Sequence, residues 1–384
     1  MNDQIYIFDT TMRDGFQASK KNIFRDQKLE VARSLADLGV DVIEAGFPGS
    51  YKGAADDVRA ISKEVGLSDG PIICALSSAK PRFIDIAVRS IEPAYKQRIH
   101  TFLATSDIHL EKKLKMTRDE AIDNLVSAVE RARQYVDDVE VSFEDAGRSD
   151  PDFMVDASNA VYDAGARTIN IPDTVGYCLP FIGVENSFPD KVKYVVDNVR
   201  NTGRNPVFSV HTHNDRGLAL ATTLADIYSG VRQVEGCMNN IGERAGNTAL
   251  EEVIFNLMIG DVKNPDTGNA FYCNAIPRNI ADTSRIVEKQ TGLKVAANKA
   301  VVGKNAFGHG AGIHQDGMKK DTSTYEIVSA DAVGMKSSMH LSVHIGRAGL
   351  QDHYGSIGIS FDKDEGFDEV ANRFYDIAHS VEEV

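Results

Sequence analysis

The stretch VFSVHTHNDRGLALATTLADIYSGVRQVEGCMN, residues 207–239, contains a complete strand–helix–strand pattern. An apolar, β-branched run at 207–213 is followed by an amphipathic segment at 215–230 and a second short run at 233–239. In the middle segment apolar residues recur every three to four positions, as they do on one face of a helix. The pattern predicts a β–α–β unit, in which a helix joins two parallel strands.

The same alternation extends through the first two thirds of the chain. Eight short β-rich runs predict strands at 5–11, 41–46, 71–76, 98–104, 139–146, 168–174, 207–213 and 233–239. Amphipathic stretches between them predict helices, for example at 25–39, 117–136 and 248–260. Eight such units over about 260 residues have the size of an α/β fold of the (β/α)8 TIM-barrel type, with a doubly wound sheet as the alternative.

The character of the sequence changes after residue 261. The segment NPDTGNAFYCNAIPRN, at 264–279, has the Pro, Gly and Asn content of a connecting segment. We therefore predict a catalytic barrel at 1–261, a linker with a small subdomain at 262–324, and a second small subdomain at 325–384.

Composition excludes several classes of protein. The 384 residues are 42% hydrophobic and 26% charged, as in globular proteins, and no apolar stretch approaches the roughly 20 residues of a membrane span. The N-terminus lacks the basic and apolar regions of a secretion signal, and a net charge of −14 without a basic run disfavours nucleic-acid binding. Four scattered cysteines form no C-x-x-C pair, which argues against a disulfide framework. We expect a cytoplasmic protein without membrane or nucleic-acid partners.

Two histidines and two oxygen ligands predict a metal site. His211 and His213 are two residues apart in a predicted strand, so both side chains project to one face. Asp14 follows the first strand and Asn247 the eighth, and strands 1, 7 and 8 are neighbours in a closed barrel. Such a set of ligands suits Mg²⁺, Mn²⁺ or Zn²⁺. The alternatives are a polar strand end for the histidines and helix-capping roles for Asp14 and Asn247.

Nine short motifs, in the same order along the chain, resemble those of the 2-isopropylmalate synthase family. They are DTTMRDGFQ (9–17), EAGFP (44–48), HTFLATS (100–106), EDAGR (144–148), NIPDTVGY (170–177), HTHND (211–215), GERAGN (242–247), GIHQDG (312–317) and YEI (325–327). The resemblance implies a TIM-barrel enzyme that uses a divalent metal. It also implies a Claisen-type condensation of acetyl-CoA with a 2-oxo acid, after which hydrolysis of the thioester releases CoA.

The resemblance also implies roles for individual residues. Arg13 would donate hydrogen bonds to the keto oxygen as it becomes an alkoxide, or to the acetyl-CoA enolate, although a surface ion pair is the alternative. His314 and Tyr325 would reach the active site of the partner subunit in a homodimer, with His314 part of the base that deprotonates the thioester methyl group. Glu144 or Glu243, with water, would assist; a plain loop histidine is the alternative for His314.

The motifs favour one substrate over its close relatives. His100, Ser142, Thr174 and Arg13 are expected to line the 2-oxo acid site, and the motifs resemble those of enzymes that take 2-oxoisovalerate and make 2-isopropylmalate in leucine biosynthesis. The alternatives are a citramalate synthase using pyruvate, a homocitrate synthase using 2-oxoglutarate, a related acyl-CoA lyase, and a metal-binding protein without catalysis. Family members that leucine inhibits carry a further regulatory domain, which this sequence is expected to lack.

Overall fold

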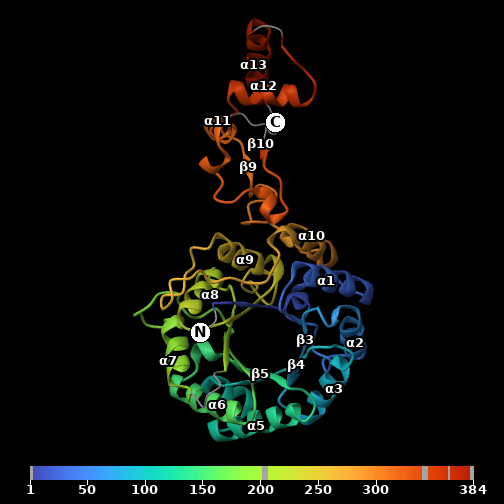
Figure 1. The fold of residues 1–384 in the computed structure, drawn as a ribbon, viewed down its shortest axis with the longest axis vertical. Coiled ribbons are helices and arrows are strands. Elements are labelled where there is room, and N and C mark those ends of the chain that lie inside the picture. Colours follow the sequence, from blue (N-terminus) through green and yellow to red (C-terminus); the bar gives the residue numbers. More distant parts are fainter. Residues whose placement is uncertain (1–2, 201–205, 340–344, 362–363, 381–384) are drawn as a thin grey trace. The chain divides into compact units, whose positions relative to one another are not determined.

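The computed structural model describes residues 3–200, 206–339, 345–361 and 364–380. Eight parallel strands close into a barrel in the order β1 to β8, and β8 pairs with β1 (Figure 1). The strands are β1 Tyr6–Asp9, β2 Val42–Glu44, β3 Ile72–Ser78, β4 Gln97–Ala104, β5 Asp138–Glu144, β6 Thr168–Asp173, β7 Val207–Thr212 and β8 Gln233–Gly236. The predicted (β/α)8 barrel is confirmed, because a doubly wound sheet would leave β1 and β8 apart.

Helices cover the outer face of the barrel (Figure 1). They are α1 Arg25–Leu38, α2 Ala54–Val65, α3 Pro81–Ile91, α5 Arg118–Arg133, α6 Pro151–Asp163, α7 Phe188–Asn198, α8 Ala219–Tyr228, α9 Leu250–Ile259 and α10 Ile280–Thr291. Local signals set their ends. Thr117 and Glu120 form a capping box at the start of α5, and α1 ends at Gly39, whose φ of 79° suits glycine.

The predicted strand runs extend beyond the hydrogen-bonded strands. The first run was predicted at 5–11, whereas β1 ends at Asp9, and β7 ends at Thr212, one residue before His213. His213 instead forms an isolated antiparallel bridge with Asn247. The backbone therefore already brings two of the predicted metal ligands together.

The centre of the barrel is polar, and a chain of hydrogen bonds crosses it. Arg98 donates from Nη1 to Oε2 of Glu140 at 2.9 Å and to Oε1 of Gln233 at 2.7 Å. Gln233 donates to Glu140 and to Ser209, and the Ser209 hydroxyl donates to Glu235 at 3.1 Å. Because buried charges are tolerated only when paired, this network closes the barrel beneath its C-terminal mouth.

Two compact units divide the chain, at residues 1–294 and 295–384. In the first, α10 lies against α1, where the hydroxyl of Thr283 donates to the carbonyl of Ser34 at 3.1 Å. The second contains β9 Gly308–His309, β10 Ser338–Met339, α11 Gly312–Lys320, α12 Arg347–Ser356 and α13 Asp364–Ala378. The subdivision at 261 and 324 stays a prediction. Among the helices of the described residues, none combines the length and apolar character needed to span a bilayer.

Asp226, on α8, is a buried carboxyl group that the predicted chemistry does not use. It is 0% exposed, and within the described residues neither of its carboxyl oxygens has a hydrogen-bond partner. Burial, with a contribution from the charge of Asp173, raises the pKa of Asp226 well above its ordinary value. The folded protein therefore holds a proton on Asp226 at pH values at which the unfolded chain has released it.

We expect Asp226→Asn to stabilise the protein increasingly as pH rises. A raised folded-state pKa means that the wild type loses stability between the unfolded-state and folded-state pKa values, and an amide removes that loss. The gain at pH 8 should be on the order of 1 kcal/mol, and smaller at pH 5. Thermal denaturation at both pH values measures it, with the exposed helical variant Asp156→Asn as control. A difference in stability between Asp226→Asn and the wild type that is the same at pH 5 and pH 8 would contradict the prediction.

Candidate active site and metal centre

A cavity of about 340 Å³ lies at the C-terminal mouth of the barrel. Its lining residues are Arg13, Asp14, Gln17, Phe47, Leu76, His100, Phe102, Ser142, Glu144, Asn170, Pro172, Thr174, His211, His213 and Glu235. Many of them are pairs two residues apart on one strand, such as Ser142 and Glu144, because alternate side chains of a strand face the barrel interior. Most of the predicted site residues in the barrel thus meet in one cavity.

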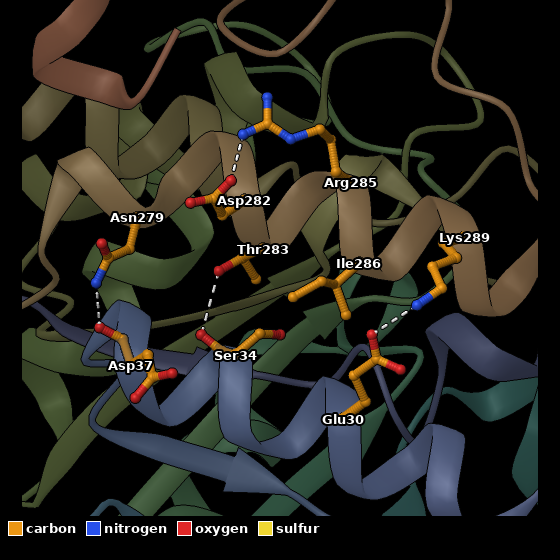
Figure 2. A pocket seen from close by; sticks show the side chains of 9 residues that line it. All are labelled: Glu30, Ser34, Asp37, Asn279, Asp282, Thr283, Arg285, Ile286 and Lys289. Carbon is orange, nitrogen blue, oxygen red and sulfur yellow. Dashed lines mark hydrogen bonds and ion pairs between the residues drawn. The ribbon is translucent and has the colours of Figure 1, made fainter.

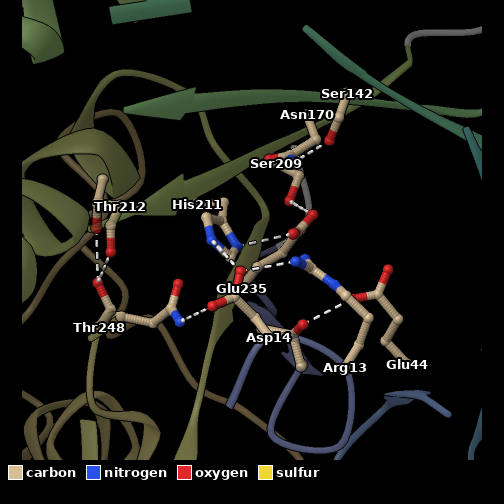
Figure 3. A network of polar contacts seen from close by, with 12 residues as sticks. Arg13, Asp14, Glu44, Ser142, Asn170, Ser209, His211, Thr212, Glu235 and Thr248 are labelled. Atoms are coloured by element: carbon tan, nitrogen blue, oxygen red, sulfur yellow. Dashed lines mark hydrogen bonds and ion pairs between the residues drawn. The ribbon is translucent and has the colours of Figure 1, made fainter. Parts of the chain in front are cut away.

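The three strongest predicted metal ligands converge within this cavity. Asp14, His211 and His213 each offer one ligand atom, and these atoms all lie within 4.8 Å of one another. The Nε2 atoms of His211 and His213 are 3.2 Å apart, and Nε2 of His211 is 4.0 Å from Oδ2 of Asp14. Figure 3 shows Asp14 and His211 pointing toward each other, with Arg13 beside them. This arrangement fits one small cation.

The ionisation of the three ligands also suits a cation. Burial lowers the pKa of His211 to about 4, and burial with the neighbouring His211 lowers the pKa of His213 to about 3. Burial opposes the charge of Asp14, but Arg13 and the two histidines outweigh it and lower the pKa of Asp14. At neutral pH the site therefore offers two neutral imidazoles and one carboxylate, the forms that bind metals.

Asn247 lies beside this group of residues on the β8 side. Its Nδ2 donates to Oδ1 of Asp14 at 3.0 Å, while its Oδ1 is buried without a hydrogen-bond partner. The alternative capping role is not observed, because Ala249 is the N-cap of α9. Asp14 precedes a short 3-10 helix but makes no side-chain cap hydrogen bond there. An unpartnered amide oxygen beside three ligands fits a fourth, direct or water-linked, position.

Residues behind the ligands orient them. Nδ1 of His211 lies 3.2 Å from Oε2 of Glu235, its register partner on β8, at ion-pair distance but without a hydrogen bond, and Nε2 is directed to the other ligands. Gly242 packs so closely that a Cβ there would lie 1.9 Å from Nδ2 of Asn247. Any larger residue at 242 would displace the amide.

Two other groups of possible ligands exist among the described residues, and both share His100. Both of its ring nitrogens are already engaged, Nδ1 with Glu44 at 2.8 Å and Nε2 with Ser142 at 2.7 Å. Glu140, in one of these groups, already accepts from Arg98 and Gln233. Because both ring nitrogens of the shared His100 are engaged, these two groups are less suited to a metal ion than Asp14, His211 and His213.

Arg13 connects the metal ligands to the rest of the cavity. Its Nη1 donates to Oδ2 of Asp14 at 2.7 Å and its Nε donates to Oε2 of Glu44 at 2.5 Å (Figure 3). Glu44 also accepts from the hydroxyl of Thr10 at 2.6 Å. Burial favours the neutral form of Glu44, but Arg13 outweighs it and lowers the pKa of Glu44 to about 2. Arg13 is thus a fixed cation at the cavity wall, and not a surface ion pair.

Sequence reasoning missed Glu44, Asn170 and Glu235 as functional residues. Asn170 donates to the hydroxyl of Ser142 at 2.6 Å, and all three line the cavity or hold residues that do. The alternation of side chains along a strand could have found them. Each lies on the same face of its strand as a predicted site residue, or next to such a residue on the neighbouring strand.

Of the remaining predicted residues of the barrel, Glu144 and Thr174 line the cavity and Glu243 does not. Glu144 lines the cavity, and the hydroxyl of Thr174 accepts the backbone N–H of Asp145 at 2.8 Å. The side chain of Glu243 is exposed and absent from the cavity lining, although its backbone N–H donates to Oδ1 of Asp14 at 3.0 Å.

His314 and Tyr325 lie in the second unit, where they form a pair. Their ring centroids are 4.3 Å apart, and both side chains are exposed. Nearby, Nε2 of the buried His309 is 3.2 Å from Oε1 of Glu326. The sequence had placed His314 and Tyr325 together, and within this unit they are.

A larger cavity, of about 540 Å³, lies away from this chemistry between α1 and α10 (Figure 2). Its polar side chains bond to one another across the crevice. Lys289 pairs with Glu30 at 2.9 Å, and Asn279 donates to the carbonyl of Asp37 at 2.6 Å. This cavity is therefore the polar seam of a helix pair, and it contains no group of metal-ligating residues within the described residues.

Comparison with known proteins agrees with this geometry. Residues 4–271 match the HMGL-like family, and residues 301–382 match the homocitrate synthase post-HMGL domain-like family. The chain is 45% identical to a 2-isopropylmalate synthase of Picosynechococcus sp. over 390 residues, covering 100% of the chain and 72% of that relative. The chain belongs to the 2-isopropylmalate synthase family. A relative with the same name from Dictyoglomus turgidum is 44% identical and is covered to 73%.

Membership of the 2-isopropylmalate synthase family confirms the resemblance carried by the nine motifs, and it makes the chain an acyltransferase. A solved HMG-CoA lyase of Bacillus subtilis shares the fold at a TM-score of 0.60 and 19% identity, covering 77% of this chain and 96% of that one. At that identity the likeness concerns the fold alone.

Proposed function

We propose that the chain condenses acetyl-CoA with 2-oxoisovalerate and water to give 2-isopropylmalate and CoA. The convergence of Asp14, His211 and His213 beside Arg13, in one cavity, carries the proposal. The shared name of the relatives supports the reaction. The match of residues 301–382 to a domain described for homocitrate synthase favours a synthase over a lyase.

Asp14, His211, His213 and Asn247 would hold the divalent ion, which when bound supplies Lewis-acid polarisation of the keto oxygen. Arg13 donates to the same oxygen as it gains negative charge, and Glu44 keeps its guanidinium oriented. The new carbon–carbon bond forms between the acetyl methyl carbon and the keto carbon. Protonation of the alkoxide and attack of water on the thioester then release the product and CoA.

His314 accepts the methyl proton of acetyl-CoA in this proposal, with Tyr325 beside it and Glu144 or Glu243 acting through water. The chain would work as a homodimer, in which the second unit of one subunit reaches the barrel of the other. Exposure of the pair supports this, since Tyr325 is 43% exposed and the neighbouring Ile313 and Ile327 are 80% and 81% exposed. The homodimer and a cytoplasmic location stay predictions.

The cavity favours a branched apolar substrate. Leu76, Phe47, Phe102 and Pro172 contribute apolar walls. Among the described residues of the lining, Arg13 is the only Lys or Arg, and it is already bonded to Asp14 and Glu44. A second substrate carboxylate, as in 2-oxoglutarate, would have no free cation to meet it. Pyruvate fits chemically and remains the alternative substrate.

Release of CoA thiol from acetyl-CoA, with Mg²⁺ or Mn²⁺ added, tests the substrate. We expect kcat/KM for 2-oxoisovalerate to exceed that for pyruvate by at least about a hundredfold, because 2-oxoisovalerate places two more carbon atoms in the apolar pocket and each contributes about 1–3 kcal/mol. 2-Oxoglutarate should be poorer still. A preference for pyruvate would make the chain a citramalate synthase, and activity with none of the three would overturn the proposed substrate class.

A further inference from the structure

The loop after β4 carries an ammonium group to the edge of the cavity. A short helix, α4 (Asp107–His109), continues into a π-helical turn at Leu110–Leu114. Nζ of Lys113, in this turn, donates to both carboxylate oxygens of Glu144, at 2.6 and 2.9 Å. Single π-helical turns occur often at functional sites. Lys113 itself is not among the residues that line the cavity, whereas Glu144 is.

This loop is held firmly at its base. The hydroxyl of Ser106 donates to Oδ2 of Asp145, the residue after Glu144, at 2.5 Å. Leu110 is 3% exposed and packs with Ala121 and Phe153. Because hydrogen bonds and apolar packing fix the turn, the position of Lys113 is set by the fold and does not depend on the ion pair.

We propose that Lys113 is a positioning residue for Glu144, and that it holds this carboxylate oriented and neutralised at the rim of the 2-oxo acid site. The proposal rests on the proposed function. Asp14 in the cavity and Glu44 behind its wall both pair with Arg13, and Lys113 is the cation paired with Glu144. Without it, Glu144 would repel both the carboxylate of the substrate and the developing enolate.

Other charged groups near Glu144 do not replace Lys113. Nδ1 of His109 is 3.9 Å from Oε1 of Glu144, beyond hydrogen-bonding distance. Arg148 donates instead to Asp145, at 2.9 Å. Lys113 therefore provides the two close donor contacts of the Glu144 carboxylate.

The partial exposure of the ion pair between Lys113 and Glu144 allows an effect on activity to be told apart from an effect on stability. The side chains of Lys113 and Glu144 are 50% and 23% exposed. Exposed ion pairs contribute little to stability. Removal of the pair should therefore leave the melting temperature unchanged, and any loss of activity would reflect the site.

The test uses Lys113→Met, with Lys112→Met as the matched control on the same turn and Lys113→Arg as the conservative variant. We expect kcat/KM for the 2-oxo acid to fall about tenfold or more in Lys113→Met, the factor typical for loss of a charge-assisted hydrogen bond. Lys113→Arg should regain most of the rate, and Lys112→Met should match the wild type. In a Glu144→Gln background, Lys113→Met should lower kcat/KM little further, because the carboxylate that Lys113 pairs with is already lost.

Two thioesters distinguish the alternatives. An exposed ammonium beside an acyl-CoA site could instead bind CoA phosphates, so each variant is assayed with acetyl-CoA and with the phosphate-free thioester S-acetyl-N-acetylcysteamine. If Lys113 acts through Glu144, kcat/KM of Lys113→Met should fall by the same factor with both thioesters. A loss confined to acetyl-CoA, full additivity with Glu144→Gln, or no loss would each overturn it.

The assay uses whichever of the three 2-oxo acids the wild type turns over best. If that acid is not 2-oxoisovalerate, the proposed substrate is wrong, but the Lys113 variants can still be compared with the wild type. If Glu144→Gln is too slow to assay, or if the wild type takes none of the three acids, binding of 2-oxoisovalerate to the Mg²⁺-loaded protein by calorimetry replaces the rate. Weaker binding in Lys113→Met than in Lys112→Met would then support the proposal, and equal binding would overturn it.

Discussion

Replacement of His213 by alanine is expected to lower the condensation rate by about a thousandfold or more, because Lewis-acid polarisation of a carbonyl contributes several kcal/mol to catalysis. His213 is nine-tenths buried and its Nε2 lies 3.2 Å from that of His211, so its replacement removes one of the three converging ligand atoms. The measurement is CoA-thiol release together with metal content after dialysis. Both should fall in the variant.

Chelation provides an independent form of the same test. A chelator should stop wild-type turnover, and added Mg²⁺ or Mn²⁺ should restore it. The exposed His379→Ala variant serves as control and should keep both its metal and its rate. Full activity of chelated wild type, or of His213→Ala, would show that Asp14, His211 and His213 do not form the reactive centre.

Replacement of Arg13 by lysine should lower kcat by about a hundred- to a thousandfold while the fold and the bound metal are retained. Loss of one preorganised donor to a developing oxyanion has an effect of this size. Arg13 bonds to Asp14 and Glu44 with two different nitrogens, and a lysine ammonium cannot reproduce that planar fork. Steady-state kinetics and metal content measure the outcome.

The matched control is Arg33→Lys, an exposed residue of α1 that pairs with Glu64. It should leave kcat unchanged. A rate for Arg13→Lys within about threefold of the wild type would show that a simple positive charge suffices at this position, and that the forked geometry of Arg13 has no catalytic role.

The barrel and the meeting of Asp14, His211 and His213 could be predicted because their signals are local. Each strand shows a short β-branched run, and each helix shows apolar residues every three to four positions. Either pattern can be recognised within about ten consecutive residues. The C-terminal ends of parallel strands share one face of a barrel, so Asp14 and the pair His211 and His213 could be expected to meet. Roles for individual residues came from the resemblance of nine motifs, and most of the barrel residues among them line one cavity.

The partners of those residues could not be predicted, because each contact joins segments far apart in the chain. Asp14 and Asn247 are separated by 233 positions and meet only when β8 closes on β1. The bond from Arg13 to Glu44 and that from Lys113 to Glu144 each span 31 positions and depend on strand register and loop path.

The sequence by itself thus determined the eight-stranded barrel, the family and the residue types that gather in the candidate metal centre, since periodicity and short motifs are properties of neighbouring residues. Only the tertiary structure decided which carboxylate pairs with which cation, that the Nε2 atoms of His211 and His213 face each other, and that Asn247 orients Asp14 instead of capping α9. The physical reason is that pairing energies depend on distance and burial in the closed barrel, which no local pattern encodes.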